Sequence, residues 1–439
     1  MALARGAMAQ RVGARRAGAR RALRCRAEAA PAVEPGFDPR AFRRQLGKSD
    51  KYTRRTTNDE EAIGRMQDEG VGYSKGGLVA KMRETGFSYV EGETTLKLAN
   101  SYGFCWGVER AVQMAYEAKR QFPEERLFIT NEIIHNPIVN ERLADMGVNF
   151  IEDVDGEGKD FTQVAEGDVV ILPAFGASVH EMKTLSDKGV NIVDTTCPWV
   201  SKVWNAVDQH TRKEHTSIIH GKWAHEETIA TASFASTYLV VKDMKETRYV
   251  CDYITKGGDR AEFLDKFKDA MSAGFDPDTD LQAVGIANQT TMLKGETEMV
   301  GKEFEKAMME RYGVENINDH YMVADTICDA TQERQDAMYE LVDAKPDVMI
   351  VVGGFNSSNT SHLQEISEDA SVPSYWVDTV QRLEPGKITH RLSHGELVVS
   401  EDWLPAGPLV IGVTSGASTP DKVVEDVLEE ILAQRRAAA

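Results

Sequence analysis

The sequence predicts an α/β protein with mainly parallel sheets, arranged as three lobes around one centre and preceded by an N-terminal extension. From about Thr94 onward, apolar strand candidates alternate with amphipathic helical stretches, which is typical of parallel α/β folds. One pattern also occurs three times: an apolar run, a polar turn, and a cysteine followed by residues with helical spacing. The three copies are LKLANSYGFCWGVER (96–110), NIVDTTCPWVSKV (191–203) and MVADTICDATQERQ (322–335).

The first 36 residues differ in composition from the rest of the chain. Eight arginines lie among alanine and glycine, and no acidic residue precedes Glu28. This composition is typical of an organelle transit peptide, which would take Cys25 with it, followed by a linker that contains proline. The segment has little serine, so these residues alone do not separate a chloroplast from a mitochondrial address. The alternative is a basic, disordered arm that binds nucleic acid.

The remainder of the chain is strongly acidic. The 439 residues carry a formal charge of −19, and because residues 1–27 contribute +8 through their eight arginines, residues 28–439 carry −27. Such a surface repels nucleic acid and anionic membranes, so we expect neither as a partner.

No apolar run approaches the length of a membrane span. Five cysteines in so long a chain do not form a disulfide scaffold and indicate a reducing compartment.

Residues 37–93 are charged and weakly amphipathic, which predicts a helical extension that wraps the core. The remainder divides into lobes at 94–197, 198–325 and 326–439, so that each lobe would bring one cysteine to the centre. Residues 250–280 resemble an insertion in the second lobe. The strand candidates, in order, are LKLAN, RLFIT, DVVILPAF, NIVDTT, TSIIHG, TYLVV, QAVGIA, DVMIVVGG and PLVIGVTSG.

Cys105, Cys197 and Cys328 are the candidate metal ligands. A thiol at a helix start lies beside unpaired N–H groups and the positive end of the helix dipole, so we expect a lowered pKa. A closed zinc site would need a fourth ligand and short CxxC pairs. Three isolated thiolates suit an iron–sulfur cluster in which one iron lacks a protein ligand and can bind substrate. Alternatives are a zinc-stabilised fold or three unrelated buried cysteines; Cys251 has no comparable setting.

Polar loops follow three of the strand candidates and precede helices. They are NQTT (288–291), NSSN (356–359) and GASTP (416–420). Ligands of α/β folds bind beyond the carboxyl ends of the strands. Hydroxyls, amides and helix-start N–H groups there predict a phosphate cradle without a lysine. Ordinary helix capping by serine, threonine and asparagine is the alternative.

Two histidines follow strands or open helices: His135 in EIIHNP and His225 in HGKWAHEET. A single histidine is usually a packed or capping residue. His225 differs because Glu227 lies two residues later, which would put a proton donor beside an anion-binding group.

Together these residues resemble the 4-hydroxy-3-methylbut-2-enyl diphosphate reductase family, which acts last in the methylerythritol phosphate route to isoprenoids. The resemblance runs from about Thr94 to Glu430. It rests on the phrases GFCWGVERAV, NEIIHNP, DTTCPWV, HEET, NQTT, DTICDAT, NSSN and TSGAS. The extension (FDPRAFRR) resembles that of the plant and cyanobacterial branch, which implies a plastid location in the chloroplast stroma.

The resemblance implies a three-lobed trefoil around one 4Fe-4S cluster. Its ligands would be Cys105, Cys197 and Cys328. Glu227, with Thr290, would relay protons, and the substrate-binding residues would be His135, His225, Thr290, Ser357, Ser358, Asn359 and Ser418. A further diphosphate histidine, expected in an AHG phrase, is here Phe175 in PAFGAS, while His180 lies nearby but does not align. We therefore expect the diphosphate to depend more on hydroxyls and amides.

The implied reaction is a two-electron reductive dehydroxylation that yields isopentenyl and dimethylallyl diphosphate. Its electrons would come from a small redox protein such as a ferredoxin. The sequence leaves the oligomeric state open, and a homodimer is among the states it allows. The rival hypotheses are a quinolinate-synthase-like iron–sulfur dehydratase and a non-catalytic iron–sulfur sensor or cluster carrier.

Overall fold

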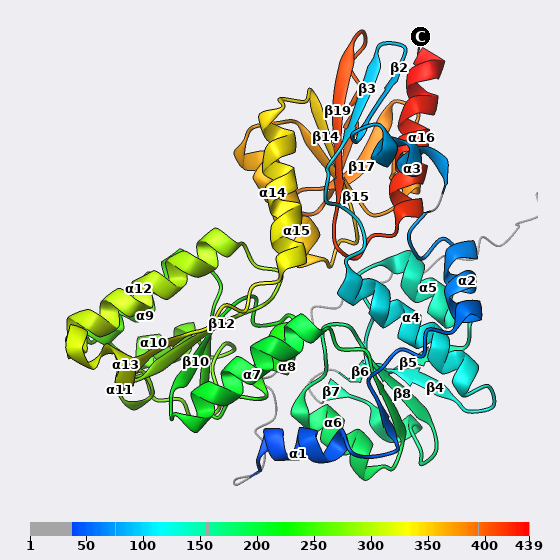
Figure 1. Ribbon diagram of the computed structural model, residues 1–439. Coiled ribbons are helices and arrows are strands. Elements are labelled where there is room, and N and C mark those ends of the chain that lie inside the picture. Colours follow the sequence, from blue (N-terminus) through cyan, green and yellow to red (C-terminus); the bar gives the residue numbers. More distant parts are fainter. Residues whose placement is uncertain (1–36, 75, 155–157, 394, 439) are drawn as a thin grey trace, which may run out of the picture.

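Three α/β lobes meet at a common centre in the computed structural model (Figure 1). The structure describes residues 37–438 except 75, 155–157 and 394. The predicted transit peptide and linker, with Cys25, lie outside the described residues. Each apolar run predicted as a strand contains one, and most of the pairing between strands is parallel. The predicted fold class is therefore confirmed.

The first lobe contains a five-stranded parallel sheet. Its strands, in spatial order, are β1 (Tyr52–Thr53), β9 (Asn191–Asp194), β8 (Val169–Leu172), β4 (Leu127–Ile129) and β5 (Val148–Phe150). The helices of this lobe are α4 (Trp106–Gln121), α5 (Pro137–Asp145) and α6 (Val179–Asp187), and a small hairpin joins β6 (Asp153–Val154) to β7 (Gly158–Lys159). Every residue of β4 and β8 is buried, as expected for a parallel sheet covered on both faces.

The second lobe contains a four-stranded parallel sheet. Its order is β11 (Tyr238–Val241), β10 (Thr216–His220), β12 (Val284–Asn288) and β13 (Tyr321–Val323). The helices are α7 (Pro198–Arg212), α8 (Glu226–Ala232), α9 (Met244–Lys256), α10 (Arg260–Lys266), α11 (Pro277–Asp280), α12 (Lys294–Tyr312) and α13 (Ile317–His320). The segment predicted as an insertion contains the end of α9 together with α10 and α11, between β11 and β12.

The third lobe contains an eight-stranded mixed sheet. Its parallel centre is β15 (Ser374–Val377), β14 (Val348–Val352), β19 (Leu409–Ser415) and β3 (Thr94–Leu98). Antiparallel strands complete both edges: β2 (Ser88–Glu91) on one side, and β16 (Leu383–Glu384), β17 (Lys387–Arg391) and β18 (Leu397–Glu401) on the other. The helices are α14 (Asp329–Asp343), α15 (Ser358–Asp369) and α16 (Asp421–Ala438).

The structure differs from the expected start of the first lobe at residue 94. Strand β3 pairs with β19 in the third sheet, and the chain enters the first lobe only with α4, which packs on α5 and β9. In the same way, α7 packs on β10 and β12, and α14 packs on α15 and β19. Each of the three cysteine phrases therefore carries the chain from one lobe into the next.

The extension contributes strands as well as the predicted helices. Its helices are α1 (Pro39–Leu46), α2 (Glu60–Asp68) and α3 (Gly77–Glu84). Strand β1 pairs with β9 at one edge of the first sheet, and β2 pairs with β3 at one edge of the third. Each of these neighbours has one side whose backbone groups are free to pair with a further strand. The extension thus builds parts of two sheets and is more than a covering layer.

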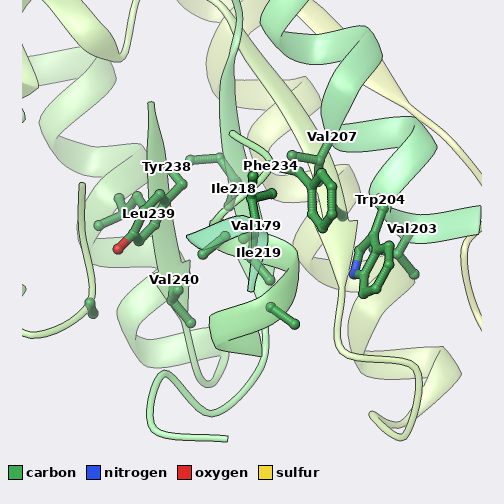
Figure 2. Close-up of a cluster of buried hydrophobic side chains, with 14 of the residues drawn as sticks. Val179, Val203, Trp204, Val207, Ile218, Ile219, Phe234, Tyr238, Leu239 and Val240 are labelled. Atoms are coloured by element: carbon green, nitrogen blue, oxygen red, sulfur yellow. The ribbon is translucent and has the colours of Figure 1, made fainter. Parts of the chain in front are cut away.

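Buried apolar side chains fill the interface between the first and second lobes. Figure 2 shows Trp204 beside Val203 at one side of this cluster and Leu239 at the other, with Ile218 and Ile219 between them. The rings of Trp204 and Phe234 stack with centroids 4.5 Å apart, and the guanidinium of Arg43 in the extension lies 4.9 Å from the Trp204 ring centre.

Among the described residues, no helix has both the length and the apolar character needed to cross a membrane.

Candidate active site

Cys105, Cys197 and Cys328 each occupy the N-cap position of a helix, namely α4, α7 and α14. The three thiols are close enough to influence one another's ionisation. A Cβ atom placed on Gly107 would lie only 2.5 Å from Sγ of Cys197, so the glycine leaves room beside that sulfur. The structure therefore brings the predicted ligands together at the junctions between lobes.

The pKa values of two of these thiols differ from the expectation. Burial raises the pKa of Cys197 to about 12, and Cys105 adds to the rise, while N–H groups of the first helical turn oppose it. Burial also raises the pKa of Cys328. The predicted lowering was wrong for Cys197 and Cys328 without a bound metal, because desolvation and thiol neighbours outweigh the helix dipole. Burial likewise raises the pKa of Cys251, to about 12, and this thiol is buried in the second lobe.

Hydrogen bonds from three parts of the chain fix the segment around Cys105. The N–H of Cys105 donates to the carbonyl of Ala417 at 3.2 Å. The hydroxyl of Tyr73 in the extension donates to the carbonyl of Phe104 at 2.6 Å. Arg334 of α14 donates to the carbonyl of Gly103 at 2.6 and 3.1 Å. The residues before Cys105 are thus held by the extension and the third lobe.

A cavity of about 310 Å³ lies between the lobes. Its wall is formed by His135, Lys222, Ala224, His225, Glu226, Phe355, Asn356, Ser357, Ser358, Ser361, Trp376, Arg391 and Ser393. Four of the predicted substrate-binding residues are in this wall: the two histidines and the two serines of the NSSN loop. The other three are not in the wall. Ser418 bonds to His135 of the wall, Thr290 bonds to Glu227, and Asn359 bonds to Ala417.

An aromatic cluster forms one part of the wall and its support. The rings of His135 and Phe175 stack with centroids 4.8 Å apart, and His225 meets His135 edge-on at 5.3 Å. Burial, and then the nearby His135, lower the pKa of His225 to about 3, so its imidazole is neutral. Phe175 therefore occupies the same cluster as the two histidines, where it offers a ring face and no hydrogen-bond donor.

The tautomer of His225 follows from its position as the N-cap of α8. Its Nδ1 accepts the backbone N–H of Glu227 at 3.1 Å, so the ring proton of the neutral imidazole lies on Nε2. That Nε2 is buried and makes no hydrogen bond to a described residue, and the same holds for Nε2 of His135. Two histidine nitrogens beside the cavity thus lack a hydrogen-bond partner among the described residues, although a carboxylate oxygen of Glu226 lies 3.9 Å from that of His135.

His135, His225 and Glu226 also place one ligand atom each within 4.8 Å of one another. A metal would require a lone pair on a histidine nitrogen. In His225 the lone pair of Nδ1 already accepts a hydrogen bond, and Nε2 carries the proton. This arrangement favours a hydrogen-bond acceptor, such as an anion, over a metal ion.

Glu227 and Thr290 form a buried pair behind His225. One carboxylate oxygen of Glu227 accepts the backbone N–H of Thr290 at 2.6 Å, and the other accepts its hydroxyl at 3.0 Å. Glu227 is 2% exposed. Burial raises its pKa to about 7, and the two hydrogen bonds from Thr290 oppose the rise only in part. The carboxyl group can therefore hold or release a proton near neutral pH.

The remaining predicted residues belong to two loops of the third lobe. Ser357 caps α15 and accepts the N–H of Thr360, so the capping alternative also describes it correctly. Asn359 accepts the N–H of Ala417 through its side chain at 2.9 Å, and the hydroxyl of Ser418 donates to the carbonyl of His135 at 3.2 Å. Residues 417 and 418 thereby connect Cys105 to the cavity wall.

Sequence reasoning missed two cations in the wall, Lys222 and Arg391. The phosphate cradle predicted from the loops contains no lysine, whereas the wall of this cavity contains Lys222. Lys222 follows β10 by two positions, so the search for polar residues beyond strand ends could have found it. Arg391 ends an antiparallel strand, and no sequence pattern indicated that this strand borders the site.

The chain matches the family model described as "LytB protein" over residues 96–432. It is 56% identical over 420 residues to the chloroplastic 4-hydroxy-3-methylbut-2-enyl diphosphate reductase of Botryococcus braunii, covering 94% of this chain and 84% of the relative. It is 58% identical over 403 residues to the enzyme of that name from Crocosphaera subtropica, covering 91% and 99%.

A solved structure also matches. The E-1-hydroxy-2-methyl-but-2-enyl-4-diphosphate reductase from Plasmodium falciparum has a TM-score of 0.57 and 25% sequence identity, over 76% of this chain and 86% of that one. This similarity in fold agrees with the three-lobed architecture described above.

Proposed function

We propose, from the premise that this chain belongs to the LytB protein family, that it reduces 4-hydroxy-3-methylbut-2-enyl diphosphate to isopentenyl and dimethylallyl diphosphate. The chain is an oxidoreductase of the isoprenoid pathway. In the reaction, two electrons and two protons enter, the C–O bond of the allylic alcohol breaks, and the oxygen leaves as water. One proton goes to the departing oxygen and the other to carbon.

One observation carries the proposal: a short chain of hydrogen bonds joins the backbone of Cys105 to the wall of the cavity. Cys105 bonds to Ala417, and the next residue, Ser418, bonds to His135 in the cavity wall. A substrate with an alcohol at one end and a diphosphate at the other needs such a pairing of sites. Binding energy from the diphosphate then positions the reacting end.

The three cysteines would hold one 4Fe-4S cluster. The donor set supports this, because three soft thiolates from separate lobes suit an iron–sulfur centre better than a closed zinc site. The space that Gly107 leaves beside Sγ of Cys197 supports it as well. When bound, the cluster supplies one-electron chemistry and a Lewis-acidic iron.

The protein would supply orientation and protons. The diphosphate accepts hydrogen bonds from Nε2 of His225, from His135, from the hydroxyls of Ser357 and Ser358, and from the amide of Asn359. Ser418 donates as well once its hydroxyl turns away from the carbonyl of His135. A protonated Glu227 donates to the hydroxyl of Thr290, whose own hydrogen is then free to pass to the substrate. The geometry that supports this relay is the 3.0 Å contact between the two side chains.

Location and electron donor are further parts of the proposal. The basic segment before Glu28 and the chloroplastic relative support a plastid location, in the stroma, where a ferredoxin-like protein would supply the electrons. We keep the homodimer as a hypothesis, which size-exclusion chromatography with light scattering would test.

Assay of the anaerobically purified protein with the proposed substrate and reduced methyl viologen tests the function. We expect both isoprenoid diphosphates as products, identified by mass spectrometry, and loss of product in Cys105→Ser. A protein that contains iron but releases neither product would contradict the reductase function and favour the dehydratase or sensor hypotheses.

A further inference from the structure

Lys222 and Arg391 bring positive charge to the cavity from two different lobes. Lys222 lies between β10 and α8 of the second lobe, and Arg391 is the last residue of β17 in the third. Both side chains line the cavity together with His135, His225 and the serines of the NSSN loop. The lobes thus present two cations, several neutral hydrogen-bond donors and one carboxylate, that of Glu226, to the same space.

The side chain of Arg391 is held in place by its surroundings. Its Nη1 donates to the carbonyl of Phe355 at 2.5 Å and its Nε to that of Gly395 at 3.1 Å. The guanidinium lies 5.5 Å from the centre of the Trp376 ring. Its Nη2 has no hydrogen bond to a described residue. A guanidinium fixed on one side retains donors on the other for a ligand at little entropic cost.

The ammonium group of Lys222 has no ion pair or hydrogen bond with any residue in the described part of the chain. Its backbone N–H donates to Gln289 at 3.1 Å, which fixes the start of the side chain. Burial lowers the pKa of Lys222, the charge of Glu365 opposes this change, and the smaller effect of the Arg391 charge adds to it. The carboxylate of Glu365 already accepts bonds from Ser361 and His362. Two cations therefore repel each other across the cavity, and an anion between them would relieve that repulsion.

Phe175 belongs to the same aromatic cluster as His135 and His225. It is 7% exposed and stacks on His135, so it supports that ring without donating a hydrogen bond. The cluster therefore offers no donor at this position, whereas the cavity wall contains two cations elsewhere.

We propose that Lys222 and Arg391 bind the diphosphate tail of the substrate and supply the positive charge that Phe175 cannot. This inference rests on the proposed function and names two specificity-determining residues for it. A diphosphate held by both residues bridges the second and third lobes, so its binding draws together the elements that carry Glu227 and the NSSN loop. A ligand with a single phosphate cannot bridge them as well.

Calorimetric titration with inorganic pyrophosphate tests the proposal without any turnover. We expect Lys222→Met to weaken pyrophosphate binding about 10- to 100-fold, since hydrogen bonds to charged groups are of that strength. Lys222→Arg should restore most of the affinity. In the reductase assay, Lys222→Met should raise KM by a similar factor and change kcat much less.

The matched control is Lys256→Met, which removes an exposed lysine paired with Asp252 at 2.7 Å on α9. Arg391→Lys keeps the charge but loses the planar fork, so we expect an intermediate loss. Phe175→His in the Lys222→Met background should recover part of the affinity. Equal pyrophosphate affinity in Lys222→Met and the unaltered protein, or no pyrophosphate binding at all, would overturn the proposal. If Lys222→Met binds pyrophosphate as tightly as the unaltered protein and also reduces the substrate at the normal rate, the proposed function still holds although this proposal fails.

Discussion

Glu227 is the residue whose chemistry depends most on its surroundings. A carboxyl group in water would be ionised at neutral pH, whereas burial raises the pKa of Glu227 to about 7. The two hydrogen bonds from Thr290 keep it oriented. The pair therefore combines a fixed geometry with a proton that can be transferred at the pH of a plastid or cytoplasm.

We predict that Glu227→Gln retains iron but lowers kcat about 100-fold or more, which is the usual contribution of a general acid. The amide has the same shape and can accept the N–H of Thr290, so the fold should persist. Iron content, the visible absorption spectrum and turnover check this. The control is Glu298→Gln on the exposed surface of α12, and near-normal turnover in Glu227→Gln would remove Glu227 from the mechanism.

The pH dependence of turnover should report the same carboxyl group. Since the protonated form donates, kcat should fall as the pH rises above about 7, and Glu227→Gln should lack this fall. The folded state binds this proton more tightly than the unfolded chain, whose pKa is 4.5. The group's contribution to stability is therefore full below pH 4.5 and declines as the pH rises toward 7. A wild-type profile that stays level from pH 6 to 9 would contradict the assignment.

At the residue scale, the sequence predicted what local patterns encode. The cysteines were expected at helix starts and are N-caps, because a strand, a turn and a helix leave a recognisable pattern. The pKa of Cys197 was not predictable, since it depends on burial and on thiols far away in the chain. Arg391 was not predictable for a related reason, because only the tertiary fold brings its strand to the cavity.

Among the elements, the N-termini of α4 and α7 must approach closely for their cysteines to meet. Gly107 in the first turn of α4 makes this approach possible, because a Cβ there would lie 2.5 Å from Sγ of Cys197. Atoms do not approach this closely, so any larger residue must displace the thiol or the helix.

We predict that Gly107→Ala lowers the iron and labile sulfide bound per chain, because it moves Cys197 away from the other two thiols. Gly64→Ala in α2 is the matched control, since a Cβ at that position would meet nothing within 4 Å. Chemical analysis of both variants, purified without oxygen, checks this. A full complement of iron in Gly107→Ala would show that the Cys197 thiol can shift without loss of the cluster.

The sequence predicted the parallel strands better than the elements at the sheet edges. Buried parallel strands are continuous apolar runs in the clearest cases, such as β8 and β14. The edge strand β1 has only two residues and lies in a charged segment, so its pairing with β9 depends on tertiary contacts. The same holds for β3, whose partner β19 lies at the far end of the chain.

The whole molecule is a ring of three lobes in which each cysteine phrase leads from one lobe into the next. This connectivity explains why one set of boundaries was predictable and another was not. The sequence predicted a helix after each cysteine, but it did not predict to which sheet the strand before each cysteine belongs. The three lobes therefore share the site at their centre, and contacts between lobes set its geometry.

Arg334 is one such contact, since it lies in α14 and donates to the carbonyls of Gly103 and Tyr102 before Cys105. It is 4% exposed. We predict that Arg334→Met costs about 3 kcal/mol of folding free energy or more, because buried carbonyls lose a charged donor. Both Tm and the iron bound per chain should fall.

The control for this prediction is Arg120→Met, which removes an exposed arginine paired with Asp59 and Glu61. Exposed ion pairs contribute little, so this variant should match the unaltered protein in Tm and iron content. If Arg334→Met also matched it, the contact between α14 and the Cys105 segment would not hold the site together.

The central claim is that three cysteines from three lobe junctions hold an iron–sulfur cluster that takes part in binding the diphosphate substrate. Mössbauer spectroscopy of the anaerobically purified, iron-57-enriched protein, before and after addition of 4-hydroxy-3-methylbut-2-enyl diphosphate, tests it most directly. We predict a cluster with one distinct iron whose signal alone changes when substrate is added. Absence of iron, or a spectrum that substrate leaves unchanged, would contradict the claim.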